Sequence, residues 1–152
     1  MNIVTRLADM GIELPVAAAP VASYVPVVVH GGLAYVSGQL PFIDGKLVTG
    51  KLGSDLGIER GIEAARACGL MILAQLEAAD LLDRVERIVK LGGFVASTPD
   101  FTDQPKVANG ASDLMVEVFG DAGKHARAAV GVPVLPLNAA VEVDAIIALK
   151  PR

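Results

Sequence analysis

The segment ARAAVGVPVLPLNAAVEVDAIIAL, residues 126–149, does most to decide the fold of this 152-residue chain. Its alternating pattern predicts two strands, residues 127–134 and 140–149, joined by the loop Leu-Pro-Leu-Asn-Ala. Successive side chains of a strand point to opposite sides of a sheet. Each predicted strand therefore has two distinct faces, one clearly apolar and one that carries small and charged residues.

The apolar face of each strand is expected to lie in the core. In the first strand Val130 and Val132 share that face, and Arg127 lies on the other. In the second strand Val143 lies on the apolar face and Glu142 on the other. Because the second face is small and partly apolar, it suits contact with another subunit better than contact with water.

The preceding hundred residues predict the remaining elements. Strands are expected at residues 27–29 and 33–37, helices at 55–79 and 105–119, and a strand at 84–97. A His-Gly-Gly turn joins the first two strands, and Ser54 is the expected N-cap of the long helix. The order ββ-α-β-α-ββ predicts an α+β fold, a mixed and mostly antiparallel sheet with two helices on one face.

Composition narrows the class of protein. Apolar residues make up 53% of the chain and charged residues 20%, which is enough for a packed core. The net charge is −4 and no Lys/Arg block occurs, so nucleic acid is not an expected partner. A secretory leader and the roughly 20 apolar residues of a membrane helix are both missing from the pattern, which favours a cytoplasmic protein.

Cofactor chemistry is not expected either. A single cysteine, Cys68, excludes an internal disulfide and any Cys-based metal cluster, and its place on the apolar stripe of the long helix predicts a buried, inert thiol. The glycine-rich stretches do not match a phosphate-binding or dinucleotide-binding pattern. We therefore interpret the chain as a single domain, with residues 1–20 as an N-terminal extension and residues 21–150 as the core.

Three segments resemble the RidA/YjgF family, also called the L-PSP or endoribonuclease-like family. The first is Tyr24, then Gly31, then Ser-Gly-Gln-Leu-Pro at residues 37–41. The second is VERIVKLGGFVAS, followed by Phe101 and Asn109. The third is residues 126–149, in which the spacing from the arginine to the glutamate fits the family signature without gaps.

The resemblance spans residues 20–150. Within the family, the chain is similar to the longer YjgF-like branch. It implies a chorismate-mutase-like fold and a homotrimer whose sheets form a central barrel, with clefts between neighbouring subunits. In active members of this family, the reaction is hydrolysis of reactive enamines and 2-imino acids to 2-oxo acids and ammonia. Small carboxylate-bearing metabolites are the implied partners.

Arg127 and Glu142 are the candidate catalytic residues. A planar guanidinium binds a carboxylate through two parallel hydrogen bonds, and a 2-imino acid carries a carboxylate beside the reacting carbon. A carboxylate in a partly dry cleft can orient water and move protons. The alternatives are structural: Arg127 in an ion pair with Asp144, for example, or Glu142 paired with Arg127 or a lysine.

The resemblance assigns substrate binding to six further positions: Tyr24, Ser37, Gly38, Gln39, Asn109 and Ala129. Tyr24 could instead be a structural residue, and Ser37-Gly38 an ordinary turn at a strand end. The family often has cysteine where this chain has Ala129, so thiol chemistry is excluded at that position. His30 is expected at a turn or interface, and His125 is a weaker candidate at the mouth of the cleft.

Three functions remain open. The first is an enamine/imine deaminase without a cofactor. The second is a trimer that binds a carboxylate metabolite without turnover, which the alanine at position 129 keeps open. The third is an endoribonuclease, against which the net charge, the 4% aromatic content and the two separated histidines all argue.

Overall fold

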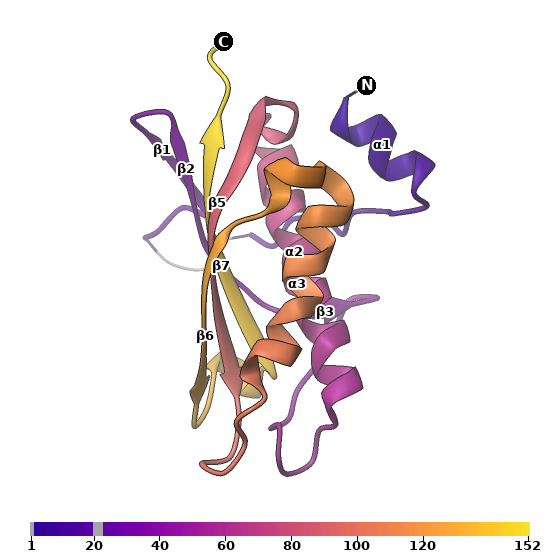
Figure 1. The fold of residues 1–152 in the computed structure, drawn as a ribbon, viewed down its shortest axis with the longest axis vertical. Coiled ribbons are helices and arrows are strands. Elements are labelled where there is room, and N and C mark those ends of the chain that lie inside the picture. Colours follow the sequence, from indigo (N-terminus) through magenta and orange to yellow (C-terminus); the bar gives the residue numbers. More distant parts are fainter. Residues whose placement is uncertain (1, 20–22) are drawn as a thin grey trace.

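The computed structural model describes residues 2–19 and 23–152. Five strands form one sheet in the order β1-β2-β7-β5-β6 (Figure 1). Their bounds are β1 Val27–His30, β2 Leu33–Gln39, β5 Val85–Ala96, β6 Ala126–Val132 and β7 Val141–Leu149. β5 and β6 are parallel and the other neighbours are antiparallel. The sheet confirms the predicted fold class, whereas the predicted boundary between extension and core, at residues 20–21, lies outside the described residues.

Two long helices, α2 Ile58–Ala78 and α3 Gln104–Phe119, cover one face of this sheet (Figure 1). Short 3-10 turns lie at η1 Leu82–Arg84, η2 Gly120–Gly123 and η3 Pro136–Asn138. In α1, Ile3–Asp9, the Ile3 N–H donates to the Asp83 carboxylate at 2.8 Å, which attaches the helix to η1. Across residues 2–19 and 23–152, no helix has both the length and the apolar character that a membrane crossing requires.

Turn chemistry accounts for the two hairpins. Gly31 and Gly32 both have positive φ between β1 and β2, which glycine adopts without steric cost. Asp44 and Gly45 adopt positive φ between β3 Phe42–Ile43 and β4 Lys46–Leu47. The turn between β1 and β2 was predicted from its Gly-Gly pair, and the Asp-Gly pair of the second turn is equally typical of such tight turns.

The predicted N-cap of the long helix is wrong. α2 begins at Ile58, and its N-cap residue is Gly57, which has no capping side chain. Ser54 lies in the loop before it, where the carboxylate of Asp55 accepts a hydrogen bond from the Lys51 N–H at 2.7 Å. The Asp55 side chain therefore stabilises this loop, and neither Ser54 nor Asp55 caps the helix.

Glycines allow the two helices to pack closely. A Cβ at Gly69 of α2 would lie 2.9 Å from a methyl carbon of Leu114 on α3. A Cβ at Gly110 of α3 would collide with the backbone carbonyl of Ile62 on α2. Both glycines thus serve the contact between α2 and α3.

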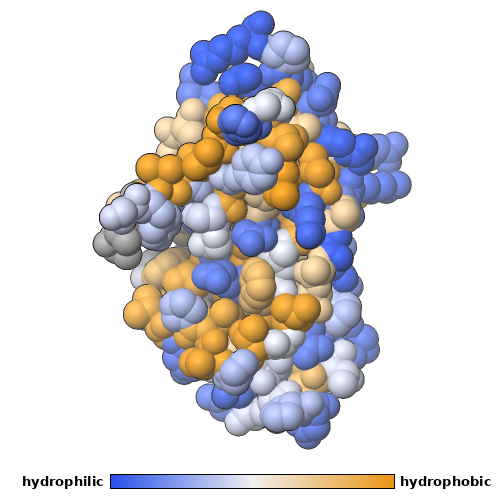
Figure 2. All heavy atoms as spheres, turned by 90° about the vertical axis from the view of Figure 1, so that its left-hand side faces the viewer, coloured by the Kyte–Doolittle hydropathy of each residue, from blue (hydrophilic) through white to orange (hydrophobic). Residues whose placement is uncertain are grey.

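The two faces of the sheet are best seen along β7. Its odd-numbered residues, from Val141 to Leu149, are buried beneath the helices, whereas Glu142 and Asp144 are half-buried on the open face. Figure 2 views the molecule from the side of this open face, where apolar residues cover much of the surface. Tyr35 and Val28 are paired across β1 and β2 and remain 42% and 49% exposed.

For β6 the predicted orientation is wrong. Val130 is 45% exposed on the open face, although the valines of β6 were expected in the core. Arg127 and Ala129 lie on the helix side instead, in register with Leu91 and Gly93 of β5. β6 is an edge strand, so an apolar outward face there marks a surface available to another molecule.

Candidate functional site

Arg127 is held on the helix side of β6 by two uncharged acceptors. One of its terminal nitrogens, Nη1, donates to the amide oxygen of Asn109 at 2.8 Å and to the hydroxyl oxygen of Ser112 at 3.2 Å. Both partners lie on α3, one helical turn apart. The ion pairs found among residues 2–19 and 23–152 do not include Arg127. Its charge is therefore not neutralised by a carboxylate of the same chain.

The alternative ion pair with Asp144 is not formed. Asp144 lies on the open face, in register with Gly92 of β5, whereas Arg127 turns to the helices on the other side. Asn109 and Ala129, two of the predicted binding residues, lie on the same side of the sheet as Arg127. The structure thus brings together the part of the predicted site that comes from α3 and β6.

Glu142 belongs to a second group on the open face. A Cβ at Gly38 would lie 2.7 Å from the carboxyl carbon of Glu142, so only glycine leaves room for that side chain. Ser37 lines a hollow of about 490 Å³ on the same face, together with Asp144 and Phe94. Ser37, Gly38 and Glu142 are therefore neighbours, as the predicted site requires.

The environment of Glu142 favours its protonated form. Burial raises the pKa of Glu142 above its ordinary value, and the nearby charge of Asp144 raises it further. Burial also raises the pKa of Asp144, although the Gly92 N–H and the charge of Lys90 act in the opposite direction. A carboxyl group whose pKa is raised toward neutrality is suited to proton transfer.

Gln39 stays in contact with the Glu142 group, because its side-chain N–H donates to the Ser37 carbonyl oxygen at 3.0 Å and to the Ser37 hydroxyl oxygen at 3.4 Å, whereas no contact between Tyr24 and either group is recorded. A bulge between Val36 and Gln39 turns the Gln39 side chain inward. There it accepts a hydrogen bond from Gln75 of α2 at 3.2 Å, and Gln75 also donates to the backbone of Ala18 at 2.8 Å. Gln39 is 5% exposed, and its partner Gln75 attaches the N-terminal segment to the core, while Tyr24 is half exposed before β1.

Within one chain, Arg127 and Glu142 lie on opposite faces of the sheet. Glu142 is in register with Phe94 of β5, and Arg127 with Leu91 of the same strand. A single chain therefore presents half of the predicted site on each side, and the two halves meet only if a second chain approaches.

Ser112 was not among the residues predicted from the sequence, and His125 was predicted only as a weaker candidate. The Ser112 hydroxyl lies 2.9 Å from Nε2 of His125, and Nδ1 of His125 lies 2.6 Å from the carbonyl oxygen of Gly123. The spacing of Asn109 and Ser112 along a predicted helix could have placed both beside the same arginine. The contact with His125 depends on how η2 folds back, which no local pattern indicated.

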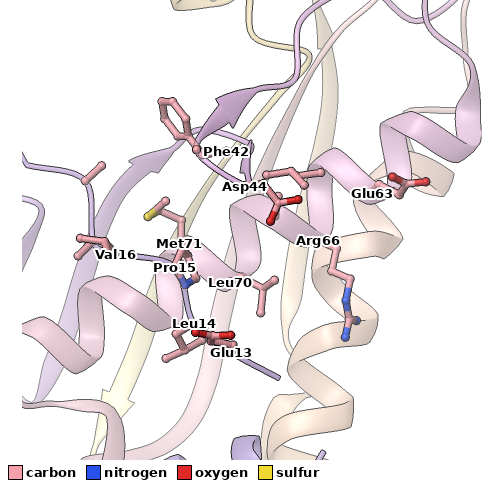
Figure 3. A pocket seen from close by; sticks show the side chains of 15 residues that line it. Glu13, Leu14, Pro15, Val16, Phe42, Asp44, Glu63, Arg66, Leu70 and Met71 are labelled. Carbon is pink, nitrogen blue, oxygen red and sulfur yellow. The ribbon is translucent and has the colours of Figure 1, made fainter. Parts of the chain in front are cut away.

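A hollow of about 880 Å³ lies elsewhere, between the N-terminal segment 13–18, the β3–β4 turn and α2 (Figure 3). Leu70 and Met71 project into it, and the predicted site residues do not line it. Arg66 at its edge pairs with Glu117 of α3 at 3.2 Å. Over residues 2–19 and 23–152, no three His, Cys, Asp or Glu side chains are grouped to hold a metal ion.

Comparison with known proteins places this architecture. Residues 4–149 match the family model described as "YjgF/chorismate mutase-like, putative endoribonuclease". The chain belongs to this YjgF family. Protein TCP17 of Trypanosoma cruzi is 53% identical over 152 residues, covering 98% of this chain and 95% of its own length.

A solved structure and a more distant YjgF relative extend the comparison. The protein Atu1372 of Agrobacterium tumefaciens, whose function is unknown, is 49% identical with a TM-score of 0.89, covering 97% of this chain and 92% of its own. A protein of Dermatophagoides farinae named 2-iminobutanoate/2-iminopropanoate deaminase is 28% identical over 141 residues, covering 91% of this chain and 95% of its own.

Proposed function

We propose that this YjgF-family protein hydrolyses reactive 2-imino acids and their enamines to 2-oxo acids and ammonia. The observation that carries the proposal is the Arg127 guanidinium, which is fixed by two neutral acceptors and lacks a carboxylate partner in its own chain. The name of the Dermatophagoides farinae relative supports this reaction type. A small α-carboxylate is the ligand group that such an arginine binds best.

The guanidinium keeps suitable donors for a ligand. Nη1 is engaged by Asn109 and Ser112, whereas no hydrogen bond within the described chain is recorded for Nη2 or Nε. These two nitrogens lie on one edge of the planar group and can bind both oxygens of a carboxylate. A hollow of about 450 Å³ beside Arg127 is also lined by Lys124, which adds a positive charge, and by Asp113, which adds a negative one.

We propose further that the complete site forms between subunits of a homotrimer, with the open faces turned toward a central barrel. The separation of Arg127 and Glu142 across the sheet supports this arrangement, as does the exposed apolar surface of Val28, Tyr35 and Val130. In a ring of identical chains, each interface joins two different surfaces. Arg127 of one subunit would then face Glu142 of its neighbour.

The chemistry proposed for this site needs no cofactor. Glu142 takes a proton from water as the water oxygen bonds to the imine carbon, and the C=N double bond becomes single. The proton passes from Glu142 to the nitrogen, and Glu142 then takes the proton of the new hydroxyl group and passes it to the same nitrogen. The C–N bond breaks, and ammonia leaves while the C=O bond of the 2-oxo acid forms. Arg127 holds the substrate carboxylate throughout, and the raised pKa of Glu142 suits it to accept and return the proton.

The test is ammonia release from freshly generated 2-iminopropanoate. Charge-assisted hydrogen bonds contribute about 1.5–3 kcal/mol each, so Arg127→Ala should lower kcat/KM by at least about 10-fold. Arg60→Ala is the matched control, because Arg60 makes only an exposed pair with Glu63 on α2. Unchanged hydrolysis in Arg127→Ala would remove this arginine from the mechanism.

Calorimetry with 2-oxo acids distinguishes the second function. Tight binding by wild-type protein, lost in Arg127→Ala and accompanied by no ammonia release, would replace the hydrolase with a carboxylate-binding trimer. Ala129 supports this second function, binding without turnover, because its methyl side chain offers no reactive group near Arg127.

A further inference from the structure

A chain of hydrogen bonds runs from the backbone at Gly123 to the guanidinium of Arg127. It passes from the Gly123 carbonyl to Nδ1 of His125 (2.6 Å), and from Nε2 of His125 to the Ser112 hydroxyl (2.9 Å). It ends with Nη1 of Arg127 at 3.2 Å from the same hydroxyl. Three separate elements, η2, α3 and β6, are joined by this chain.

The direction of every bond follows from the chemistry of its two ends. A carbonyl oxygen only accepts, so Nδ1 of His125 must carry the proton. In the tautomer whose one ring proton lies on Nδ1, Nε2 has a lone pair that accepts the hydroxyl proton of Ser112. The oxygen of Ser112 remains free to accept from Arg127, whose guanidinium only donates.

We propose that Ser112 and His125 are positioning residues for Arg127, an inference that rests on the carboxylate-binding role proposed above. With Ser112 oriented by His125, its lone pair faces Nη1, and Asn109 accepts from the same nitrogen. These two acceptors fix the rotation of the guanidinium, so that the edge formed by Nη2 and Nε stays available to the ligand.

A serine beside a histidine is also the arrangement of a nucleophile and its base, but the surroundings here favour positioning. Ser112 lies in the interior of α3, where backbone N–H groups are used by the helix itself. Backbone donors for a developing oxyanion are therefore occupied next to Ser112. Its oxygen moreover already accepts a hydrogen bond from a cation, which lowers its nucleophilicity.

The first test measures the hydrogen bonds directly and needs no ligand. The chain has two histidines, so His30→Gln leaves His125 as the only imidazole for ¹⁵N NMR. The expected result is an imidazole whose proton lies on Nδ1 and whose Nε2 accepts, the less common tautomer. A proton on Nε2 would overturn the proposal, whether or not the protein hydrolyses imines.

The second test measures positioning through the NMR signals of the Arg127 guanidinium. Slow rotation, with separate Nη1 and Nη2 resonances, is expected in the wild-type protein, and averaged resonances in Ser112→Ala. Ser112→Thr, which keeps the hydroxyl, should restore the separation, and Ser54→Ala in the loop before α2 is the control. Rotation that Ser112→Ala leaves unchanged would overturn the proposal.

The third test links positioning to the ligand. The net loss of one hydrogen bond typically costs about 0.5–1.5 kcal/mol, so Ser112→Ala and His125→Leu should each raise KM by about three- to tenfold. Because the carboxylate is bound equally before and during the reaction, kcat should change less than KM. If Ser112→Ala and His125→Leu both keep the wild-type KM while Arg127→Ala loses activity, the positioning role of Ser112 and His125 is overturned and the proposed function stands.

Discussion

Mixing two inactive variants should restore activity if the site is shared between subunits. Arg127→Ala and Glu142→Gln each remove one half of the proposed site, and the two residues lie on opposite faces of the sheet in one chain. Each seam of a ring takes its arginine from one subunit and its glutamate from the next. A seam is intact when the arginine comes from a Glu142→Gln chain and the glutamate from an Arg127→Ala chain.

The size of the recovery follows from counting. In an equal mixture that assembles at random, each of the two conditions is met with probability one half, so about one quarter of the seams are intact. The mixture should therefore show about 25% of wild-type ammonia release, whatever the number of subunits in the ring. If both residues came from the same chain, every site would carry one lesion and the mixture would stay inactive.

The assay needs co-refolding or co-expression, so that chains exchange before the ring closes. The two variants carry distinct tags, and rings that retain both tags are assayed beside the unselected mixture. A trimer that holds both kinds of chain has one intact seam in three, so the selected rings should show about one third of wild-type ammonia release. Each variant alone, purified in the same way, sets the baseline. Activity in the mixed rings no higher than the average of the two parents would refute the shared site.

Three further outcomes are expected. Gly38→Ala should lower turnover while the fold is retained. The new Cβ would lie 2.7 Å from the carboxyl carbon of Glu142 and would displace that side chain; unchanged kinetics would contradict that contact. The free energy of unfolding should fall as the pH rises through the raised pKa values of Glu142 and Asp144, because the folded chain holds these protons more tightly than the unfolded chain. Urea unfolding over a pH series should show this slope flattened in the double variant Glu142→Gln/Asp144→Asn, and an unaltered slope would count against it. Gly110→Ala should destabilise the protein by about 1–3 kcal/mol, because the added methyl collides with the backbone of α2; thermal unfolding with an unchanged midpoint would exclude that overpacking.

Local patterns were sufficient for most of the elements. The helical stripe of α2 and the alternation of β7 depend on periods within one segment, which the sequence displays directly. The hairpin turns depend on residues that tolerate positive φ, such as Gly32 and Gly45. The start of α2 was misplaced, because Ser54 and Asp55 carry a capping pattern that is used by the preceding loop.

The orientation of β6 could not be derived from its own residues. Alternation separates two faces, but it does not say which face meets the helices when both can be buried. The valines of β6 were assigned to the core because apolar residues normally lie there, yet Val130 is exposed on the open face. An apolar face that packs against a second copy has the same sequence pattern as a face that packs inside one chain.

Residues of the candidate site were predicted only where their spacing in the sequence or the family resemblance indicated them. Arg127, Asn109 and Glu142 were named as candidate site residues, and their division between two faces depends on strand order. Gln39 was placed with them by the family resemblance; the bulge in β2 directs it into the core, where it keeps a hydrogen bond to Ser37. Ser112 needed the meeting of α3 with the turn after it, a contact between segments that no single motif contains.

The charges around Glu142 explain why a substrate would be held between two subunits. Lys90 lowers the pKa of Asp144, but among the described residues no cation acts on Glu142 in that way. Covering the open face would remove more water and raise the cost of ionising Glu142, unless a positive group came with the cover. A 2-iminium acid supplies that group, because its nitrogen is positive and its carboxylate negative. With the carboxylate on Arg127 of one chain and the iminium nitrogen near Glu142 of the next, each end of the ligand neutralises one protein charge. Direct contact of Arg127 with Glu142 would leave no space for the ligand, and their separation on opposite faces of the sheet prevents that contact within a chain.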